Sequence, residues 1–281
     1  MTATISTARG GALTILGPDQ TDLLRDLDRA ITGWAAGAGA REIMAPPVYP
    51  LSDLEKFDVY ENFPHLQFVG GPLDVTGAPP APVEGAFASR DVDPPFLGLP
   101  HSSCYGAYLF FEKQAVAPDT TITLINRCFR NEAKYEGLRR LLSFQMREIV
   151  AVGTFEHTQD VNARFTDRIE RFAKDLGLVL DKKAATDPFF ERDGGRALLQ
   201  RLSPVKHEFQ VDGLAIASVN THRNFFGERC DITVEGTGDH AFTGCVAFGL
   251  ERWLAVLSDL YGGDLQRARA AVNAAADAAA T

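Results

Sequence analysis

Apolar residues recur at helical spacing in several stretches of the chain, which predicts amphipathic helices. The first helix is expected at residues 19–38. Its apolar stripe consists of Leu23, Leu27, Ile31 and Trp34. The second is expected at 158–176 and the third at about 247–261, each followed by glycine. The alanine-rich tail after Arg269 offers little apolar surface, so we expect it to be helical but frayed.

Shorter apolar or alternating runs predict strands. The expected strands are residues 41–47, 105–111, 121–129, 144–152, 206–211, 214–220 and 230–235. The first ends in two prolines, so it is expected at a sheet edge. Residues 72–100 hold seven of the fifteen prolines and are expected as an irregular surface loop. Strands in the middle of the chain with helices around them predict one α+β domain over 1–281, with a mainly antiparallel sheet.

Composition narrows the class of protein. Of the 281 residues, 45% are hydrophobic and 23% are charged, which suits a globular chain and excludes a disordered one. We find no apolar run of about 18 residues and no signal-peptide pattern, so we expect no membrane helix, no export and a cytoplasmic location. The formal net charge of −9 argues against general nucleic-acid binding. The cysteines at 104, 128, 230 and 245 form no C-x-x-C pair and are expected to be reduced.

The segment Cys128-Phe-Arg-Asn-Glu132 carries the first candidate chemistry. On a strand, Arg130 and Glu132 would point to one face, where a cation can grip an anion and a carboxylate can accept from a donor. A plain surface ion pair explains the same spacing. The returning strand adds Phe144, Met146 and Glu148 on one face, and an aromatic side chain there can stack on a base.

Two further features point to anion binding. Arg139 and Arg140 lie in the charged segment between these two strands, where they would be close to phosphates. Gly249-Leu-Glu-Arg252 opens an amphipathic helix and places a guanidinium near a helix N-terminus. Leu-Glu-Arg alone is common in solvated helices.

Together these segments resemble the catalytic domain of class II aminoacyl-tRNA synthetases. The helix at 19–38 with the strand up to Pro47 resembles motif 1, which implies a homodimer. Residues 129–144 resemble motif 2, and residues 249–252 resemble motif 3. The resemblance implies that Arg130 holds the α-phosphate of ATP and Glu132 contacts the nucleotide. It also implies that adenine stacks between Phe144 and Arg252.

The resemblance also implies a metal. Cys104, Glu148 and Cys245 are similar to the zinc-binding set of methanogen-type seryl-tRNA synthetases. Two thiolates and a carboxylate suit Zn²⁺ and leave one position for the α-amino group of a substrate. Cysteines are also often simply buried. Cys128 is the alternative ligand, His101 a weaker fourth ligand, and Cys230 is expected in the core.

Because the segment that resembles motif 1 begins within the first twenty residues, we expect no additional tRNA-binding domain of the kind that a seryl-tRNA synthetase carries. The chain therefore resembles the truncated homologues known as amino acid:[carrier protein] ligases. This family activates a small amino acid, glycine or alanine, with ATP and Mg²⁺ and passes it to the phosphopantetheine thiol of a carrier protein. Transfer to a tRNA or another acceptor is an alternative. A non-catalytic paralogue is another, and the intact Arg130, Glu132, Phe144 and Arg252 argue against it.

Some assignments are less specific. Where the synthetases place an acidic Mg²⁺ ligand, this chain has Ala215, so the Mg²⁺ of ATP would be held either by Glu235 or mostly by ATP itself. Ser218, Asn220 and His222 share strand parity and are expected to face the substrate, although His222 fits a core position equally well.

A basic stripe on the second helix is the candidate docking surface for an acidic carrier protein. Its residues are Arg164, Arg168, Arg171 and Lys174. Acidic residues are interspersed, so an ordinary solvated face is the competing interpretation.

Overall fold

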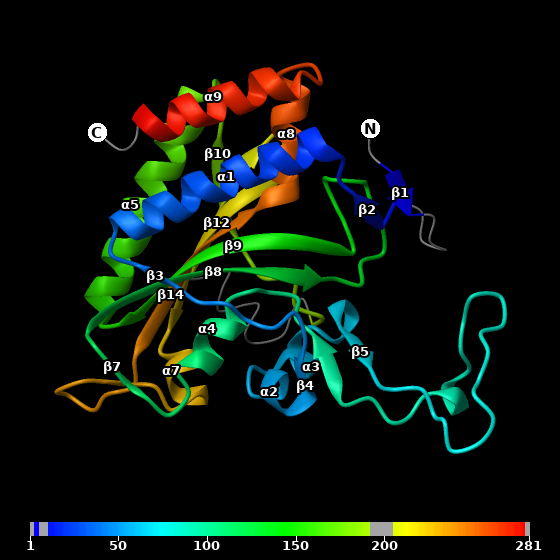
Figure 1. Ribbon diagram of the computed structural model, residues 1–281. Coiled ribbons are helices and arrows are strands. Elements are labelled where there is room, and N and C mark those ends of the chain that lie inside the picture. The colour runs from blue at the N-terminus through cyan, green and yellow to red at the C-terminus, as the bar shows by residue number, and fades with distance from the viewer. Residues whose placement is uncertain (1–2, 6–10, 192–204, 279–281) are drawn as a thin grey trace.

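A large twisted sheet forms the centre of the protein, with helices on both of its faces (Figure 1). This computed structural model describes residues 3–5, 11–191 and 205–278. In spatial order, the strands of the sheet are β10 (Asp181–Ala185), β11 (Lys206–Val211), β12 (Leu214–Arg223), β14 (Phe242–Gly249), β9 (Ser143–Gly153), β8 (Asp119–Phe129) and β3 (Arg41–Glu42). Neighbouring strands are antiparallel, except that the short edge strand β3 runs parallel to β8. The expected α+β class is confirmed, and the strand before the prolines does lie at the edge.

Long helices cover one face of this sheet. They are α1 (Pro18–Gly37), α5 (Phe155–Asp175), α8 (Leu250–Leu260) and α9 (Leu265–Ala278). The apolar stripe predicted on α1 is buried, since Leu23, Leu27 and Ile31 are at most 1% exposed. The helix α5 begins earlier than predicted because the Thr154 hydroxyl accepts the backbone N–H of His157 and caps the helix.

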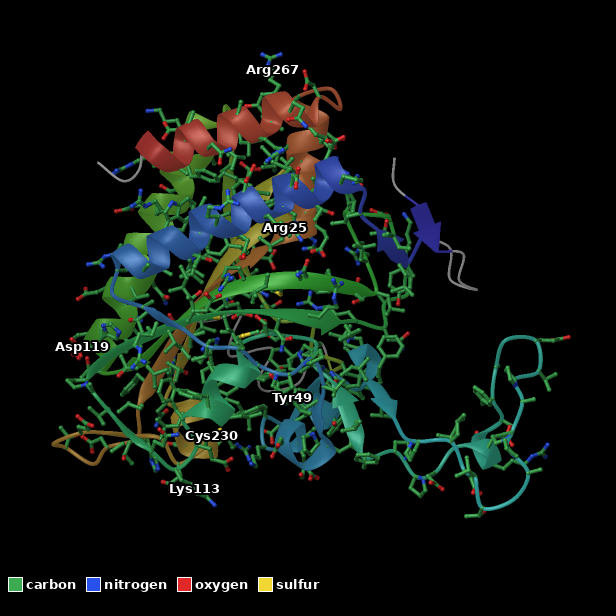
Figure 2. The ribbon with its side chains drawn as sticks, in the orientation of Figure 1. Arg25, Tyr49, Lys113, Asp119, Cys230 and Arg267 are labelled. Carbon is green, nitrogen blue, oxygen red and sulfur yellow. The ribbon has the colours of Figure 1, made fainter. Side chains whose placement is uncertain are left out.

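Shorter helices cover the opposite face, where they enclose a second apolar cluster. They are α2 (Leu51–Glu55), α3 (Val59–Asn62), α4 (Tyr105–Phe110) and α7 (Phe225–Arg229). Figure 2 shows the two sides: Arg25 on α1 and Arg267 on α9 lie above the sheet, and Tyr49 and Cys230 lie below it. The two faces therefore have separate cores and can serve different purposes.

Small sheets and single turns complete the described chain. They are the pair β1 (Ala3–Ile5) and β2 (Leu13–Ile15), the sheet of β4 (Tyr49–Pro50), β6 (Leu97–Leu99) and β5 (Phe68–Gly70), the pair β7 (Ala115–Val116) and β13 (Thr233–Val234), and the 3-10 turns η1 (Pro64–Leu66) and η2 (Ser89–Asp91). Most of the proline-rich segment is irregular, as predicted, and it projects from the body as an arm (Figure 1).

A buried arginine ties β9 to the helix layer. Arg147 Nε and Nη2 donate to the two carboxylate oxygens of Asp28 on α1, at 2.7 and 3.0 Å. Its Nη1 donates to Glu42 of β3 at 2.6 Å. This network links three elements that resembled motifs 1 and 2, and it was not anticipated from the sequence.

The prediction of a strand at 105–111 is wrong, because this segment forms α4. A short apolar run without alternation does not distinguish a buried strand from a buried helix. The glycine at position 106 lets α4 pack closely on the preceding segment: a Cβ on it would lie 2.6 Å from Ala45 Cβ and 2.8 Å from the Tyr49 hydroxyl. Cys104 consequently lies at the start of a helix and not before a strand.

The boundaries around motif 3 also differ from the prediction. Residues 247–249 belong to β14, and α8 begins at Leu250. The whole strand β14 was missed because it is buried on both faces, so its sequence is continuously apolar and does not alternate. The strand expected at 230–235 shrinks to Thr233–Val234, since Cys230 directly follows α7.

The tail does not fray within the described residues. On α9, Ala268 and Val272 are fully buried and Ala275 is 4% exposed. Arg269 donates to Asp26 at 2.8 Å and to Asp22 at 3.1 Å, so α9 is held against α1. Residues 279–281 lie outside the described part. Every helix within 3–5, 11–191 and 205–278 is too short or too polar to cross a bilayer.

Candidate active site

The residues that carry the predicted chemistry meet on the sheet face opposite α1 and α5. The strand β14 lies between β12 and β9, and its Cys245 pairs with Asn220 of β12. Ala247 pairs with Ser218 on one side and with Glu148 on the other. Because alternate residues of a strand share a face, the side chains of Cys245, Asn220, Ser218 and Glu148 project to the same side.

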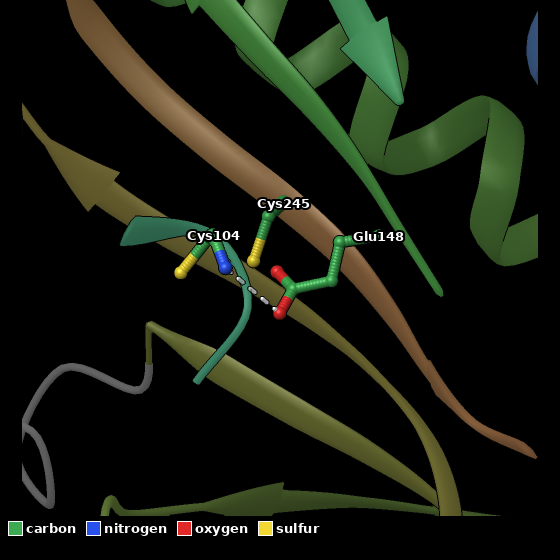
Figure 3. A group of neighbouring side chains, drawn as sticks. All are labelled: Cys104, Glu148 and Cys245. Carbon is green, nitrogen blue, oxygen red and sulfur yellow. Dashed lines mark hydrogen bonds between the residues drawn. The ribbon is translucent and has the colours of Figure 1, made fainter. Parts of the chain in front are cut away.

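Cys104, Glu148 and Cys245 form a buried cluster (Figure 3). One potential ligand atom from each, a sulfur or a carboxylate oxygen, lies within 4.8 Å of the others. Their exposed fractions are 4%, 1% and 3%. The three side chains come from the start of α4, from β9 and from β14, so the fold brings together residues that are far apart in the sequence.

The carboxylate of Glu148 is held by one oxygen only. Its Oε1 accepts hydrogen bonds from the Ser103 hydroxyl at 2.7 Å and from the backbone N–H groups of Ser103 and Cys104, both at 3.2 Å. Its Oε2 is buried and has no hydrogen-bond partner among the described residues. An orphaned buried carboxylate oxygen is costly, and this one lies in a cluster with two sulfurs. Two sulfurs and one oxygen suit zinc, so the residues present fit the metal that the resemblance implies.

The thiol of Cys245 resists ionisation in these surroundings. The neighbouring Cys104 side chain, burial and the Glu148 carboxylate together raise the pKa of Cys245 well above its ordinary value. A divalent cation has the opposite effect, so metal binding would release this proton. Asn220 Nδ2 lies 3.4 Å from the Cys245 sulfur, and His222 Nε2 lies 3.8 Å from it.

The alternative ligands are not part of the cluster. Cys128 is buried on β8 opposite Phe144, and within the described residues the cluster contains only the three side chains named above. Both ring nitrogens of His101 are already engaged, by the Gln67 amide at 2.9 Å and by the Tyr105 hydroxyl at 3.0 Å. Cys230 belongs to the apolar core, as expected.

A cavity of about 500 Å³ opens beside the cluster. Ser218, Asn220 and His222 line it, as their strand parity predicted. Burial lowers the pKa of His222 to about 4, so this imidazole is neutral at physiological pH. Much of the remaining wall is aromatic, formed by Phe57, Phe63, Tyr105, Phe189, Phe225 and Phe226. Apolar walls with a few convergent polar groups are typical of small-molecule sites.

A second, smaller cavity adjoins the first, and its lining carries more cations than carboxylates. The cations are Arg130, Arg139, Arg140, Lys206 and Arg252. The carboxylates are Glu132, Glu208 and Glu251. The excess of positive charge suits a polyphosphate ligand.

Phe144 lies in this second cavity together with both predicted arginines. The guanidinium carbon of Arg130 is 5.0 Å from the centre of the Phe144 ring, and its Nε donates to the His101 carbonyl at 3.1 Å. Arg252 donates to two backbone carbonyl oxygens, both at 3.0 Å. Burial, reinforced by Arg130, lowers the pKa of Arg252 to about 10, so its guanidinium stays charged at neutral pH.

Arg130 and Glu132 do not lie on a strand as predicted, because β8 ends at Phe129. Both residues nevertheless line the second cavity, and Arg140 donates to the Glu132 carboxylate there. Phe144, Met146 and Glu148 do share one face of β9, as their alternation along the strand predicted. Phe144 and Met146 line the second cavity, and Met146 and Glu148 line the first.

Glu235 lies away from both cavities. It is exposed after β13, and its backbone N–H donates to the Val116 carbonyl. The prediction that it serves the ATP site is therefore not supported by its position. Sequence reasoning missed Glu208, which lines the second cavity, and Lys206, which lines both. Their i, i+2 spacing on an expected strand was the available signal.

The basic stripe on α5 also lies apart from the cavities. The apolar face of α5 packs on the sheet face that carries α1, opposite the two cavities. Arg164 and Arg171 are exposed, and the guanidinium of Arg168 lies 5.6 Å from the ring centre of Trp34. The stripe is thus not beside an opening of either cavity.

No family model matches this chain. Two curated proteins of Bradyrhizobium diazoefficiens, amino acid–[acyl-carrier-protein] ligases 1 and 2, are each 31% identical to it. The first match covers 81% of this chain and 74% of the relative, and the second covers 78% and 70%. A type-2 serine–tRNA ligase of Methanocaldococcus jannaschii is 24% identical over 87% of this chain and 52% of its own length.

Solved structures show the same fold. Methanopyrus kandleri seryl-tRNA synthetase, in a complex with a tRNA from A. aeolicus, matches with a TM-score of 0.72 at 21% identity, over 87% of this chain and 53% of the synthetase. Giardia lamblia prolyl-tRNA synthetase matches with a TM-score of 0.65 at 15% identity, over 89% of this chain and 48% of that one. The chain thus spans about half the length of these synthetases and has the class II synthetase fold. At 31% identity over most of both sequences, it belongs to the amino acid–[acyl-carrier-protein] ligases, which are adenylate-forming enzymes.

Proposed function

We propose that this protein activates a small amino acid with ATP and transfers it to the phosphopantetheine thiol of a carrier protein. The observation that carries the proposal is the pair of adjoining cavities. One contains the Cys104–Glu148–Cys245 cluster, the other is rich in cations, and Arg130 lines both.

In the first half-reaction, a carboxylate oxygen of the amino acid attacks the α-phosphorus of ATP, and pyrophosphate leaves. The carboxylate needs no protein base, so the work of the enzyme is positioning and charge stabilisation. Arg130 lines both cavities, so we assign it to contact both the carboxylate and the α-phosphate. Phe144 offers a ring on which adenine can stack, and Arg252 supplies a charge for the polyphosphate.

Zinc would be held by Cys104, Glu148 and Cys245, and when bound it would serve as a Lewis acid for the α-amino group of the substrate. Ser218 and Asn220 line the same cavity and offer further hydrogen bonds to the amino acid. Magnesium arrives with ATP, and we assign Glu208 as its candidate protein ligand in place of Glu235, because Glu208 lines the second cavity.

In the second half-reaction, the carrier thiol attacks the carbonyl carbon of the adenylate, a thioester forms and AMP leaves. The first cavity is larger than glycine or alanine would fill. We therefore expect the same cavity to admit the end of the phosphopantetheine arm beside a small amino acid.

Amino-acid-dependent exchange of pyrophosphate into ATP tests the proposal, with zinc-loaded protein and each proteinogenic amino acid in turn. Exchange with glycine or alanine supports it. Absence of exchange with every amino acid contradicts it and favours a non-catalytic paralogue. Adding a phosphopantetheinylated carrier protein or total tRNA to the active mixture then identifies the acceptor by which one becomes aminoacylated.

Substitutions test the two cavities separately. Arg130→Ala should abolish exchange with little loss of folding, because Arg130 is only partly buried. Cys245→Ser should release most of the zinc, measured by elemental analysis. Cys230→Ser is the matched control, since Cys230 is equally buried but lies outside the cluster, and its metal content should not change.

The carrier surface and the assembly can be measured directly. Because the α5 stripe faces away from the cavities, the double variant Arg164→Glu with Arg171→Glu should leave transfer to the carrier unchanged. A loss of transfer with intact pyrophosphate exchange would restore the stripe as the docking surface. The homodimer stays a prediction, and light scattering on the purified protein measures it.

A further inference from the structure

The boundary between the two cavities contains a second cation besides Arg130. The residues that line both cavities are Arg130, Met146, Lys206, Ser218 and Ala247. Within this set, only Arg130 and Lys206 are charged. The proposed function assigns no role to Lys206.

The sheet places Lys206 and Arg130 on opposite sides of this boundary. Lys206 is the first residue of β11 and pairs with Asn220 of β12, which in turn pairs with Cys245 of β14. At about 4.8 Å per strand, the backbone of Lys206 lies about 10 Å from that of Cys245. Arg130 follows β8, on the far side of β14 and β9. Two cations thus approach the same space from two directions.

The ammonium group of Lys206 is held by one carboxylate from each cavity. It donates to Asp187 at 3.2 Å and lies 3.4 Å from Glu208. Asp187 lines the first cavity and Glu208 lines the second. The Lys206 side chain is only 17% exposed, so it is confined at the boundary and not spread into solvent. Both of these partners are anionic oxygens, and the carboxylate of an amino acid and the α-phosphate of ATP would also present anionic oxygens.

The adenylation step brings two anions together at such a boundary. A carboxylate oxygen forms a bond to the α-phosphorus while the bond from that phosphorus to the bridging oxygen breaks, and the electron pair leaves with pyrophosphate. Negative charge increases on the α-phosphoryl oxygens as the carboxylate approaches. A single guanidinium on one side of the reacting groups compensates only part of this charge. A fixed cation on the other side stabilises the transition state further, and this stabilisation is largest where water is excluded.

We propose that Lys206 is a second catalytic cation of this enzyme, which contacts the amino-acid carboxylate and the α-phosphoryl group as they react. This inference rests on the proposed function and adds a residue to it. Substrate oxygens replace Asp187 and Glu208 as partners of the ammonium group, so Lys206 contributes mainly once both substrates are present. The competing interpretation is structural, in which Lys206 only ties β11 to the segment around Asp187.

Lys206→Met, which keeps an unbranched side chain of nearly the same length and removes its charge, tests the proposal in the zinc-loaded protein. We expect kcat for pyrophosphate exchange to fall about 10²–10³-fold, as for the loss of one transition-state donor. The dissociation constant of ATP alone should change by less than about threefold, because the charge is needed only when the carboxylate joins the α-phosphate. Lys206→Arg should recover part of the activity, since it keeps the charge with a different shape.

Lys182→Met on the neighbouring strand β10 is the matched control. Lys182 is 42% exposed, lies 4.0 Å from Glu170 of α5 on the sheet face opposite the cavities, and lines neither cavity, so exchange should be unchanged. A structural tie would instead lower thermal stability or raise KM for the amino acid while kcat stays the same, and that result overturns the proposal. Exchange by Lys206→Met at the wild-type rate overturns it equally. If the wild-type protein itself exchanges with no amino acid, the proposed function fails, and the variants are not needed to show it.

Discussion

The buried glutamate of motif 3 makes the stability of this protein depend on pH. Glu251 is the second residue of α8 and is 4% exposed. Its carboxylate oxygens accept the backbone N–H of Gln145 at 3.0 and 2.8 Å. Burial raises the pKa of Glu251 from 4.5 to about 7, although the hydrogen bond from Gln145 opposes this shift.

The direction of the effect follows from the two pKa values. Below pH 4.5, which is the pKa of Glu251 in the unfolded chain, the carboxyl group is protonated in both the folded and the unfolded state. The stability that comes from burying it in the neutral form is then fully present. As the pH rises toward 7, the unfolded chain ionises first, so the free energy of unfolding falls. Because one pKa unit is worth about 1.36 kcal/mol, the gap between 4.5 and about 7 amounts to about 3 kcal/mol lost above neutrality.

Glu251→Gln removes this dependence, since the amide stays neutral at all pH values and its oxygen can still accept from Gln145. Urea unfolding of both proteins without ATP, at about pH 5 and about pH 8.5, measures the difference in free energy of unfolding. Relative to wild type, the variant should gain about 2–3 kcal/mol in free energy of unfolding between about pH 5 and about pH 8.5. Glu170→Gln on α5 is the control for the Glu-to-Gln exchange itself, because its side chain is 50% exposed and lies outside both cavities.

The same difference in stability between Glu251→Gln and wild type at both pH values would contradict this prediction. In that case Glu251 would be ionised throughout, and burial would not control its protonation. A variant that is less stable by a constant amount would show only that the amide fits poorly, so the change with pH is the quantity that decides.

Further substitutions test the cluster and the helix layer. Ser103→Ala removes the hydroxyl that holds Glu148, so zinc affinity measured by chelator competition should fall about 10–100-fold; unchanged affinity would show that the two backbone N–H groups suffice. Arg147→Met should cost about 3 kcal/mol in urea unfolding, at the low end for a broken buried pair because Asp28 is partly exposed. Val272→Ala on α9 should cost about 2 kcal/mol, whereas a tail that frays in solution would show no loss.

Long periodic segments of the fold could be predicted from the sequence. The helices α1 and α5 have stripes that repeat over several turns, and burial of that stripe leaves few alternatives. The segments α4 and β14 could not be predicted, because a short run of apolar residues is compatible with either element and tertiary packing decides between them. The packing of α9 was missed for a related reason: alanine and valine contribute little area singly, but α1 offers a complementary surface together with Asp22 and Asp26.

Some residues of the candidate site could likewise be predicted from the sequence, and others could not. Parity along β9 placed Phe144, Met146 and Glu148 toward the cavities without knowledge of the fold. The approach of Cys104 to Glu148 came only from the family resemblance, since spacing along a sequence does not determine which strands are neighbours. Lys206 and Ser103 were missed because their roles depend on the strand pairing of β11 and on the turn before α4.

Adjacent residues of β9 serve opposite sides of the molecule. Arg147 reaches Asp28 in the helix layer, and Glu148 reaches the sulfur cluster on the other side. Because side chains alternate along a strand, inserting or deleting one residue within β9 would turn both side chains to the other face of the sheet: the guanidinium would lie on the side of the cluster and the carboxylate on the side of the helix layer. We therefore expect relatives of this enzyme to differ in length in the segment between β8 and β9, where Arg139 and Arg140 lie, and to keep the length of β9 itself constant.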